Sequence, residues 1–392
     1  MISKKVSHAM QSSSWIRRMF EEGARLRSKH GDDAVFDFSL GNPVLDPPQR
    51  VLDALVRAAD PKRPGAHRYM PNAGYPEVRA AVASYLARET GRSFEGRHVV
   101  MSVGAGGGLN VVLKTLLDPG DEVILLAPYF PEYDFYVDNH GGSPVRVETD
   151  DRFQLDLAAI ERAITPRTKA ILLNSPNNPC GVIYPRASLD ALGEILRAAS
   201  RRHGRTIAIV TDEPYRHIAY GTPVPWVFAS YEHVVLVTSH SKDLALPGER
   251  IGFIAFDPRF EDVDAVVAGA TFATRTLGFV NAPAIQQRAV AELQGFSVDP
   301  AIYRTKRDRL FAALTAAGYD VILPEGAFYM FPRTPVADDV AFVRMLLDEM
   351  ILAVPGTGFG RPGHMRLSYC VEDATIERAL PGFERAIRRA RG

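Results

Sequence analysis

A lysine and an arginine stand eight residues apart in "TSHSKDLALPGERIG" (238–252), and both side chains can carry chemistry. The segment that leads into them, "HVVLVTS" (233–239), is apolar and β-branched, as in a buried strand. We therefore expect Lys242 just past the carboxyl end of a core strand, where open α/β sheets bind their ligands. A solvated surface loop is the alternative interpretation of this segment taken alone.

Two turn-rich segments follow other predicted strands. "MSVGAGGGLNVVLKTLL" (101–117) places four glycines between a strand and a helix, where free N–H groups attract an anion. It is not a dinucleotide fingerprint, because Leu109 stands where the third glycine is needed. "NSPNNPCG" (174–181) can fix Asn177 or Asn178 in one orientation. The alternatives are a flexible turn in the first segment and a rigid turn in the second.

Three more polar residues have types and places that suit ligand binding. Asp212, in "TDEPYRHIAY" (211–220), ends a predicted strand and can pair with a cationic ring nitrogen, while Tyr215 can donate a phenolic hydrogen bond. Arg366, in "HMRLSY" (364–369), lies on a short apolar strand and suits bidentate binding of a carboxylate. A helix N-cap for Asp212 and a structural ion pair for Arg366 are the simpler alternatives.

Alternating strand and helix patterns must position these residues. A largely parallel, doubly wound sheet with helices on both faces is expected from this alternation. After about residue 285 the pattern becomes a smaller α+β domain. We expect an N-terminal arm that completes the small domain (1–45), a large domain (46–285) and the small domain (286–392). The strands are predicted at 98–103, 121–128, 169–174, 206–212, 233–239 and 251–256, and helices at 75–90, 109–117, 131–139, 157–164, 187–202, 282–293 and 302–318.

Composition excludes several classes of partner. The 392 residues carry a formal net charge of zero, which offers no overall field for nucleic acid or an acidic membrane. The first twenty residues lack the apolar core of a signal peptide, and no apolar run is long enough to span a bilayer. Only Cys180 and Cys370 are present, which favours a reducing compartment. We expect a cytoplasmic protein without a membrane, nucleic-acid or metal partner.

The order of these motifs resembles the fold-type I pyridoxal-phosphate enzymes, specifically the class I/II aminotransferases. The resemblance runs from "FSLGNP" (38–43) to "RLSY" (366–369). Its most specific part is the combination of three motifs, which are S-x-S-K-x7-R-x-G (239–252), N-N-P-x-G (177–181) and D-E-P-Y (212–215). It implies the type I transferase fold and pyridoxal 5′-phosphate as the cofactor.

The resemblance also implies a role for each motif residue. Lys242 would form the internal aldimine with the cofactor and move the proton between Cα and C4′. Asp212 would pair with the pyridinium nitrogen and sustain the ring as an electron sink. The remaining contacts would be Ser239, Arg250 and the amides of Ala105 and Gly106 on the phosphate, Asn178 and Tyr215 on the ring's phenolate oxygen, and Phe130 on the ring face.

Assembly and substrate binding follow from the same resemblance. Tyr69, in "HRYMPNAGYPEVR" (67–79), would reach the neighbouring subunit's phosphate, which implies a homodimer with shared active sites. Arg366 would bind the substrate α-carboxylate, helped by Asn178 and the Gly41 backbone. Arg275, in "FATRTLGFVNAP", lies near where relatives place an arginine for a distal carboxylate. Some bacterial aspartate enzymes have a lysine in place of Gly106, so its absence puts aspartate specificity in doubt.

The expected activity is transfer of an amino group from an α-amino acid to a 2-oxo acid, with 2-oxoglutarate and glutamate as one pair. The route would be ping-pong through pyridoxamine phosphate. A C–S β-lyase, a decarboxylase or an amino-acid oxidase shares the fold and Lys242 and remains the alternative. A non-catalytic regulator would need a DNA-binding module for which the N-terminal forty residues leave little room. A nicotinamide dehydrogenase would leave Lys242, Asn178 and Asp212 unexplained.

Overall fold

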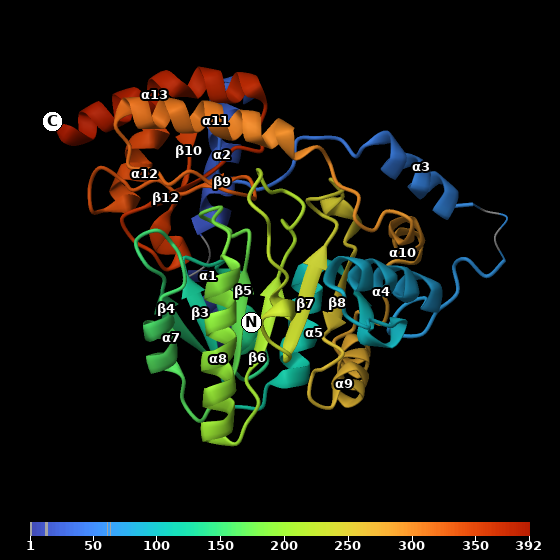
Figure 1. Ribbon diagram of the computed structural model, residues 1–392. Helices are drawn as coiled ribbons and strands as arrows, with labels where there is room; N and C mark the ends of the chain where they lie inside the picture. The colour runs from blue at the N-terminus through green and yellow to red at the C-terminus, as the bar shows by residue number, and fades with distance from the viewer. Residues whose placement is uncertain (1, 12–14, 61, 63) are drawn as a thin grey trace.

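A seven-stranded sheet forms the centre of the computed structural model, which describes residues 2–11, 15–60, 62 and 64–392 (Figure 1). Its strand order is β2-β8-β7-β6-β5-β3-β4. β8 runs antiparallel to both neighbours, and the other pairs are parallel. This confirms the mostly parallel α/β fold. The strands are β2 (Val99–Ser102), β3 (Glu122–Ala127), β4 (Ser143–Glu148), β5 (Thr168–Asn174), β6 (Ala208–Asp212), β7 (Val234–Ser239) and β8 (Gly252–Phe256).

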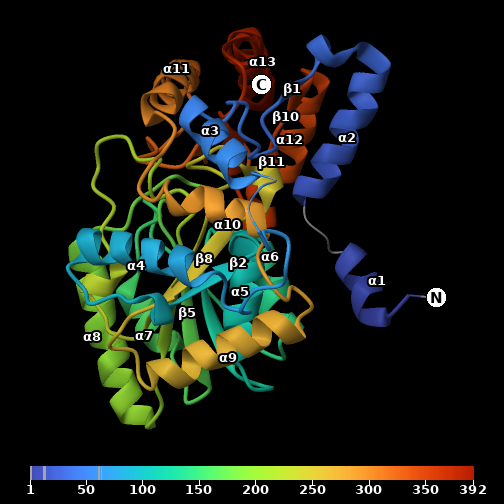
Figure 2. The ribbon, with the colours of Figure 1, turned by 90° about the vertical axis from the view of Figure 1, so that its right-hand side faces the viewer.

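Helices cover both faces of this sheet because alternate strand residues point to opposite sides. Ile124 and Leu126 of β3 belong to the core layer under α4, α7 and α8, whereas Val123 and Leu125 belong to the layer under α5, α6 and α9. Figure 2 shows α8 on one side of the sheet and α6 on the other. The helices are α4 (Pro76–Thr90), α5 (Gly104–Leu116), α6 (Glu132–Asn139), α7 (Leu157–Ala163), α8 (Arg186–His203) and α9 (Val263–Thr276).

Two features of the large sheet differ from the prediction. The glycine run was expected as a turn before a helix at 109–117, but α5 already begins at Gly104, so this prediction of a turn was wrong. β4 was not predicted, because its sequence "SPVRVE" is half polar and the strand is a partly exposed edge of the sheet. The six predicted strands and the helices at 75–90, 131–139, 157–164 and 187–202 are confirmed.

A second group of elements follows the sheet and lies above it in Figure 1. β12 lies between β11 and β9 in an antiparallel sheet, and β10 pairs in parallel with β1 near the N-terminus. The expected domain boundaries at residues 45 and 285 stay a prediction. The elements are α10 (Ala284–Ala291), α11 (Pro300–Ala317), β9 (Tyr329–Met330), α12 (Asp339–Asp348), β10 (Ile351–Leu352), β11 (Val354–Pro355), β12 (Met365–Ser368) and α13 (Asp373–Arg391).

The N-terminal segment contributes α1 (Lys4–Gln11), α2 (Trp15–His30), β1 (Phe36–Asp37) and α3 (Gln49–Ala58). Short 3-10 helices lie at η1 (Asp32–Ala34), η2 (Gly96–His98), η3 (Val227–Ala229), η4 (Pro247–Glu249) and η5 (Gly356–Phe359). None of the helices in the described ranges is long and apolar enough to cross a membrane.

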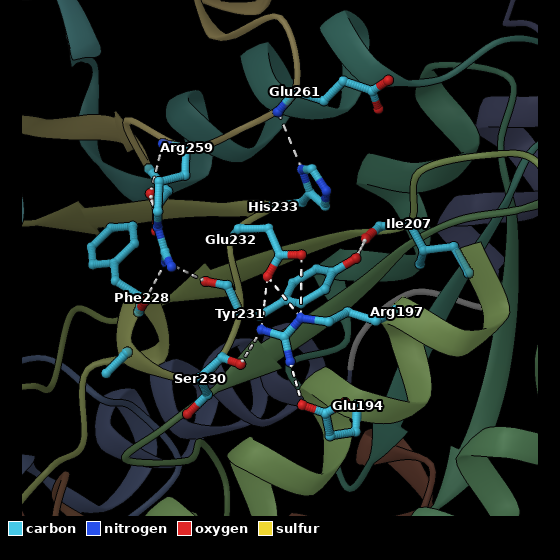
Figure 3. A network of polar contacts seen from close by, with 12 residues as sticks. Glu194, Arg197, Ile207, Phe228, Ser230, Tyr231, Glu232, His233, Arg259 and Glu261 are labelled. Carbon is cyan, nitrogen blue, oxygen red and sulfur yellow. Dashed lines mark hydrogen bonds and ion pairs between the residues drawn. The ribbon is translucent and has the colours of Figure 1, made fainter. Parts of the chain in front are cut away.

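A polar network supports the sheet at the end opposite to the carboxyl ends of its parallel strands (Figure 3). Arg197 of α8 donates to both carboxylate oxygens of Glu232, with Nη2 2.7 Å from Oε2, and to the Ser230 carbonyl at 2.9 Å. Glu232 stands just before β7, so this contact ties α8 to the start of the strand that leads to Lys242.

We expect Arg197→Ala to lower the free energy of unfolding by about 1–3 kcal/mol, because a half-buried charged network loses its donor. Arg388→Ala on α13 is the matched control, since it removes an exposed ion pair with Glu384. That change is expected to cost less than about 1 kcal/mol. Urea unfolding of both variants measures the difference, and equal losses would contradict the network's role.

Candidate active site

The predicted site residues meet in one cavity of about 300 Å³ at the carboxyl ends of the parallel strands. Its lining comes from the ends of β5, β6 and β7, the start of α5, the start of α6 and the C-terminal sheet. The predicted residues that line it are Gly41, Ala105, Gly106, Phe130, Asn178, Asp212, Tyr215, Ser239, Lys242, Arg250 and Arg366. The structure therefore brings together residues separated by more than 300 positions.

Lys242 follows β7 directly, as the pattern of its segment predicts. Its Nζ donates a hydrogen bond to the Gly41 carbonyl at 2.7 Å and lies 5.5 Å from the centre of the Phe328 ring. Burial lowers the pKa of Lys242 to about 8; Cys370 opposes this, and Arg366 and Arg250 add to it. A sizeable fraction of the amine is therefore neutral near physiological pH, which is the form that acts as a nucleophile or a base.

Asp212 ends β6, is buried and lines the cavity. Its Oδ2 accepts a hydrogen bond from the Tyr133 hydroxyl at 2.6 Å, whereas its Oδ1 is buried and has no hydrogen-bond partner. Burial raises the pKa of Asp212 to about 7, the Tyr133 hydrogen bond lowers it, and Glu213 raises it. An unpartnered buried oxygen of this kind fits a cationic ring N–H, because such a donor would satisfy it.

The start of α5 forms a cradle for an anion. The first N–H groups of a helix have no partner within the helix, and here they belong to Gly104 and the residues after it. A Cβ at Gly104 would lie 2.8 Å from Arg250 Nη2, and one at Gly106 would lie 3.1 Å from the Tyr136 hydroxyl. Glycine thus leaves the backbone open beside the Arg250 guanidinium. Ser239 and Ser241 line the same cavity, so the donor set fits a phosphate.

Arg366 on β12 is only 2% exposed and is held by contacts on several sides. Nη1 donates to Asn178 Oδ1 at 3.1 Å and Nη2 to the Ser39 carbonyl, while Nε has no partner. The guanidinium lies 4.7 Å from the Tyr329 ring centre and 4.8 Å from that of Phe359. A buried guanidinium that faces a cavity and keeps a free donor suits binding of a carboxylate.

Gly41 closes the cavity on the side of Lys242. A Cβ at this position would lie 1.9 Å from the Tyr329 hydroxyl, so no other residue fits without displacing that ring. The Tyr329 hydroxyl is also 3.0 Å from the hydroxyl of Tyr215. The backbone of residue 41 therefore reaches Lys242 only because it carries no side chain.

Several lining residues were missed by sequence reasoning. Tyr133 is the last residue of "APYFPEY" (127–133), the segment that contains Phe130, and Tyr136 follows three residues later on the same predicted helix, so the sequence held a signal for both. Asn174 opens the quoted Asn-Pro segment, and its side chain donates to the Asp212 carbonyl at 2.7 Å. Tyr329 had no local signal. The full set that was missed is Leu109, Tyr133, Tyr136, Asn174, Pro214, Ser241, Pro247 and Tyr329.

Tyr69 and Arg275 are the two predicted residues that do not line the cavity of this chain. Tyr69 is 91% exposed, and Arg275 is exposed on α9. Both were expected to act on a neighbouring subunit, and their roles stay predictions.

Comparison with known proteins identifies the family. The model of aminotransferase class I and II matches residues 33–383. The chain is 37% identical over 370 residues to an aspartate/prephenate aminotransferase of Thermus thermophilus, covering 92% of this chain and 93% of the relative. It is 33% identical to an aspartate aminotransferase of Geobacillus stearothermophilus, with 98% of each covered. A solved aminotransferase structure from Eubacterium rectale superposes with a TM-score of 0.96 at 36% identity over the whole of both chains.

The cavity offers an amine, an anion cradle and a carboxylate partner for a ring nitrogen, and the family match spans the elements that supply them. The chain belongs to the class I and II aminotransferases and is a pyridoxal-phosphate-dependent transaminase of fold type I.

Proposed function

We propose that this transaminase moves the amino group of an α-amino acid to a 2-oxo acid by a ping-pong route, with 2-oxoglutarate and glutamate as one substrate pair. The observation that carries the proposal is the amine of Lys242, with its lowered pKa, in a cavity that also contains the Arg366 guanidinium. The first group can exchange a proton with a substrate, and the second can hold the substrate's α-carboxylate.

The residues around the cavity fit the separate parts of pyridoxal phosphate, which are its phosphate, its ring nitrogen, its ring oxygen and its ring face. The α5 N-terminus, Ser239 and Arg250 would hold the phosphate, and Asp212 Oδ1 would accept from the ring nitrogen. Asn178 and Tyr215 would contact the ring oxygen, with Phe130 on the ring face. When bound, the cofactor supplies an electron sink for the charge that develops at the substrate Cα.

Lys242 has two roles in this proposal. Its Nζ would hold the cofactor through the aldehyde carbon and, when free, would take the proton from the substrate Cα. The Gly41 carbonyl, which accepts from Nζ, holds the amine over the cavity. Arg366, Asn178 and the Gly41 backbone would orient the substrate by its α-carboxylate.

The proposal includes a homodimer with shared active sites. The partner subunit's Tyr69 would reach the phosphate, and the partner subunit's Arg275 would contact a distal carboxylate. The exposure of both side chains in one chain supports such a role. A cytoplasmic location, with no nucleic-acid or membrane partner, is part of the same proposal.

The rate at which the cofactor-free protein binds pyridoxal phosphate covalently should rise with pH and level off above about 8. Only the neutral amine attacks an aldehyde, and burial has lowered the pKa of Lys242 from its ordinary 10.5 to about 8. Stopped-flow absorbance measures this rate. A rate that keeps rising to pH 10 would contradict the lowered pKa.

Transfer of label from single ¹⁵N-amino acids to 2-oxoglutarate tests the proposed activity. Labelled glutamate with at least one amino acid is the expected product. Release of pyruvate, carbon dioxide or peroxide without labelled glutamate would instead indicate a β-lyase, a decarboxylase or an oxidase. A preference for aspartate among the donors would support the role of Arg275.

A further inference from the structure

The hydroxyl of Tyr136 lies beside the anion cradle and has no assigned role in the proposed reaction. Tyr136 belongs to α6 and lines the cavity together with Ala105, Gly106 and Arg250. A Cβ at Gly106 would lie 3.1 Å from the Tyr136 hydroxyl oxygen. Because the Cβ atoms of a helix point toward its N-terminus, this hydroxyl lies on the side of α5 where the N–H groups are free.

The Tyr136 hydroxyl is available as a donor. Within the described ranges it makes no hydrogen bond, whereas Tyr129 and Tyr133 of the same segment donate to carboxylates at 2.9 and 2.6 Å. Burial raises the pKa of Tyr136 to about 12, nearby carboxylates add to this shift, and Arg250 opposes it. The phenol therefore keeps its proton at neutral pH and can donate it to an acceptor.

The first turn of α5 has no side-chain hydroxyl of its own. Residues 104–108 read G-A-G-G-G, so this turn offers an anion only its backbone N–H groups. Ser239 and Arg250 come from other elements, at the end of β7 and just after η4. A phosphate presents three strong acceptor oxygens, which leaves a place for a further donor. The missing side chain at Gly106 and the hydroxyl of Tyr136 therefore complement each other.

We propose that the Tyr136 hydroxyl donates a hydrogen bond to the phosphate of the cofactor and supplies the side-chain hydroxyl that the first turn of α5 lacks. This inference rests on the phosphate position in the proposed function and deepens it. It adds α6 to the elements that hold the phosphate. The contact is independent of the amino acid that reacts, because the phosphate belongs to the cofactor.

Two other roles of Tyr136 make different predictions. A ring that only packs in the wall of the cavity would be replaced fully by phenylalanine. A hydroxyl that contacts the side-chain carboxylate of glutamate would change the kinetics with glutamate and leave the affinity for the cofactor unchanged. Pyridoxal, which has the ring and the aldehyde but no phosphate, separates a phosphate contact from any contact with the ring.

The test compares the binding of pyridoxal phosphate and of pyridoxal to the cofactor-free wild type and to cofactor-free Tyr136→Phe by equilibrium dialysis. We expect the Kd for pyridoxal phosphate to rise about 10- to 100-fold in the variant, because a hydrogen bond to a charged group is lost. The Kd for pyridoxal should change less than about threefold. The variant is expected to fold, since the hydroxyl that it lacks makes no hydrogen bond within the described ranges.

Tyr129→Phe is the matched control. It removes a phenolic hydroxyl from the same segment, but this hydroxyl donates to Asp134 at 2.9 Å and accepts from Arg146 at 2.6 Å. Tyr129 is not among the residues that line the cavity. The Kd values of both ligands should therefore change less than about threefold in this variant.

An unchanged Kd for pyridoxal phosphate in Tyr136→Phe would overturn the assignment, and so would equal losses for the two ligands or an equal loss in Tyr129→Phe. If only kcat/KM for glutamate falls, the hydroxyl contacts the substrate instead, and the assignment is wrong. A wild type that shows the expected difference between the two ligands but transfers no nitrogen would overturn the proposed function and leave the phosphate contact intact.

Discussion

Lys242→Ala is expected to lower kcat for amino-group transfer by at least about 10⁴-fold, because the only amine placed for proton transfer in the described cavity is removed. The fold should persist, since Lys242 contributes one hydrogen bond to the Gly41 carbonyl. Single-turnover kinetics with a saturating amino acid measures the loss at the chemical step.

Lys242→Arg serves as the control for charge. It keeps a cation in the cavity, but a guanidinium stays protonated and is neither nucleophile nor base near neutral pH. We expect it to be as inactive as the alanine variant. Activity within tenfold of the wild type in either variant would show that another group moves the proton.

Arg366→Lys is expected to lower kcat/KM for every α-amino acid by about 10²–10³-fold, because a buried bidentate partner of a carboxylate is replaced by a point charge. The effect should appear mainly in KM, since the α-carboxylate is bound in both the ground and transition states. Lysine keeps the positive charge between the Tyr329 and Phe359 rings, so the variant is expected to fold.

An alkylamine that lacks a carboxylate provides the substrate control for this variant. Its slow reaction should be nearly the same in Arg366→Lys and in the wild type. An equal loss for the amine would mean that Arg366 acts on the cofactor or on the fold. A loss confined to acidic amino acids would mean that Arg366 contacts the side chain.

Strands and strand ends were the most predictable part of this protein. The apolar β-branched runs before Asp212 and Lys242 identify β6 and β7, and the parallel sheet brings their carboxyl ends together. The local pattern and the family resemblance together therefore predict most of the residues that line the cavity. The resemblance also predicted Arg366, although its strand, β12, lies in a different sheet from β6 and β7.

The start of α5 shows why a local pattern can mislead. Four glycines in five residues favour a turn, because glycine is a poor helix former. The helix includes these glycines and packs closely on the sheet: a Cβ at Gly108 would lie 2.7 Å from Val237 Cγ1. Tertiary packing determines the conformation of this segment, and a single sequence does not show which residues pack together.

Tyr329 shows the other limit of the sequence. Tyr329 lies near Gly41 and Tyr215, which are 288 and 114 positions away in the chain, and its segment has no distinctive motif. Roles of this kind depend on contacts between distant segments.

The absorption spectrum of the purified protein tests the central claim most directly. With pyridoxal phosphate bound through Lys242, a visible band is expected, which a donor amino acid removes and 2-oxoglutarate restores. Lys242→Ala should bind the cofactor without forming the same band. A wild type with no band after reconstitution, or with a band that no amino acid changes, would contradict the account of Lys242 and of amino-group transfer.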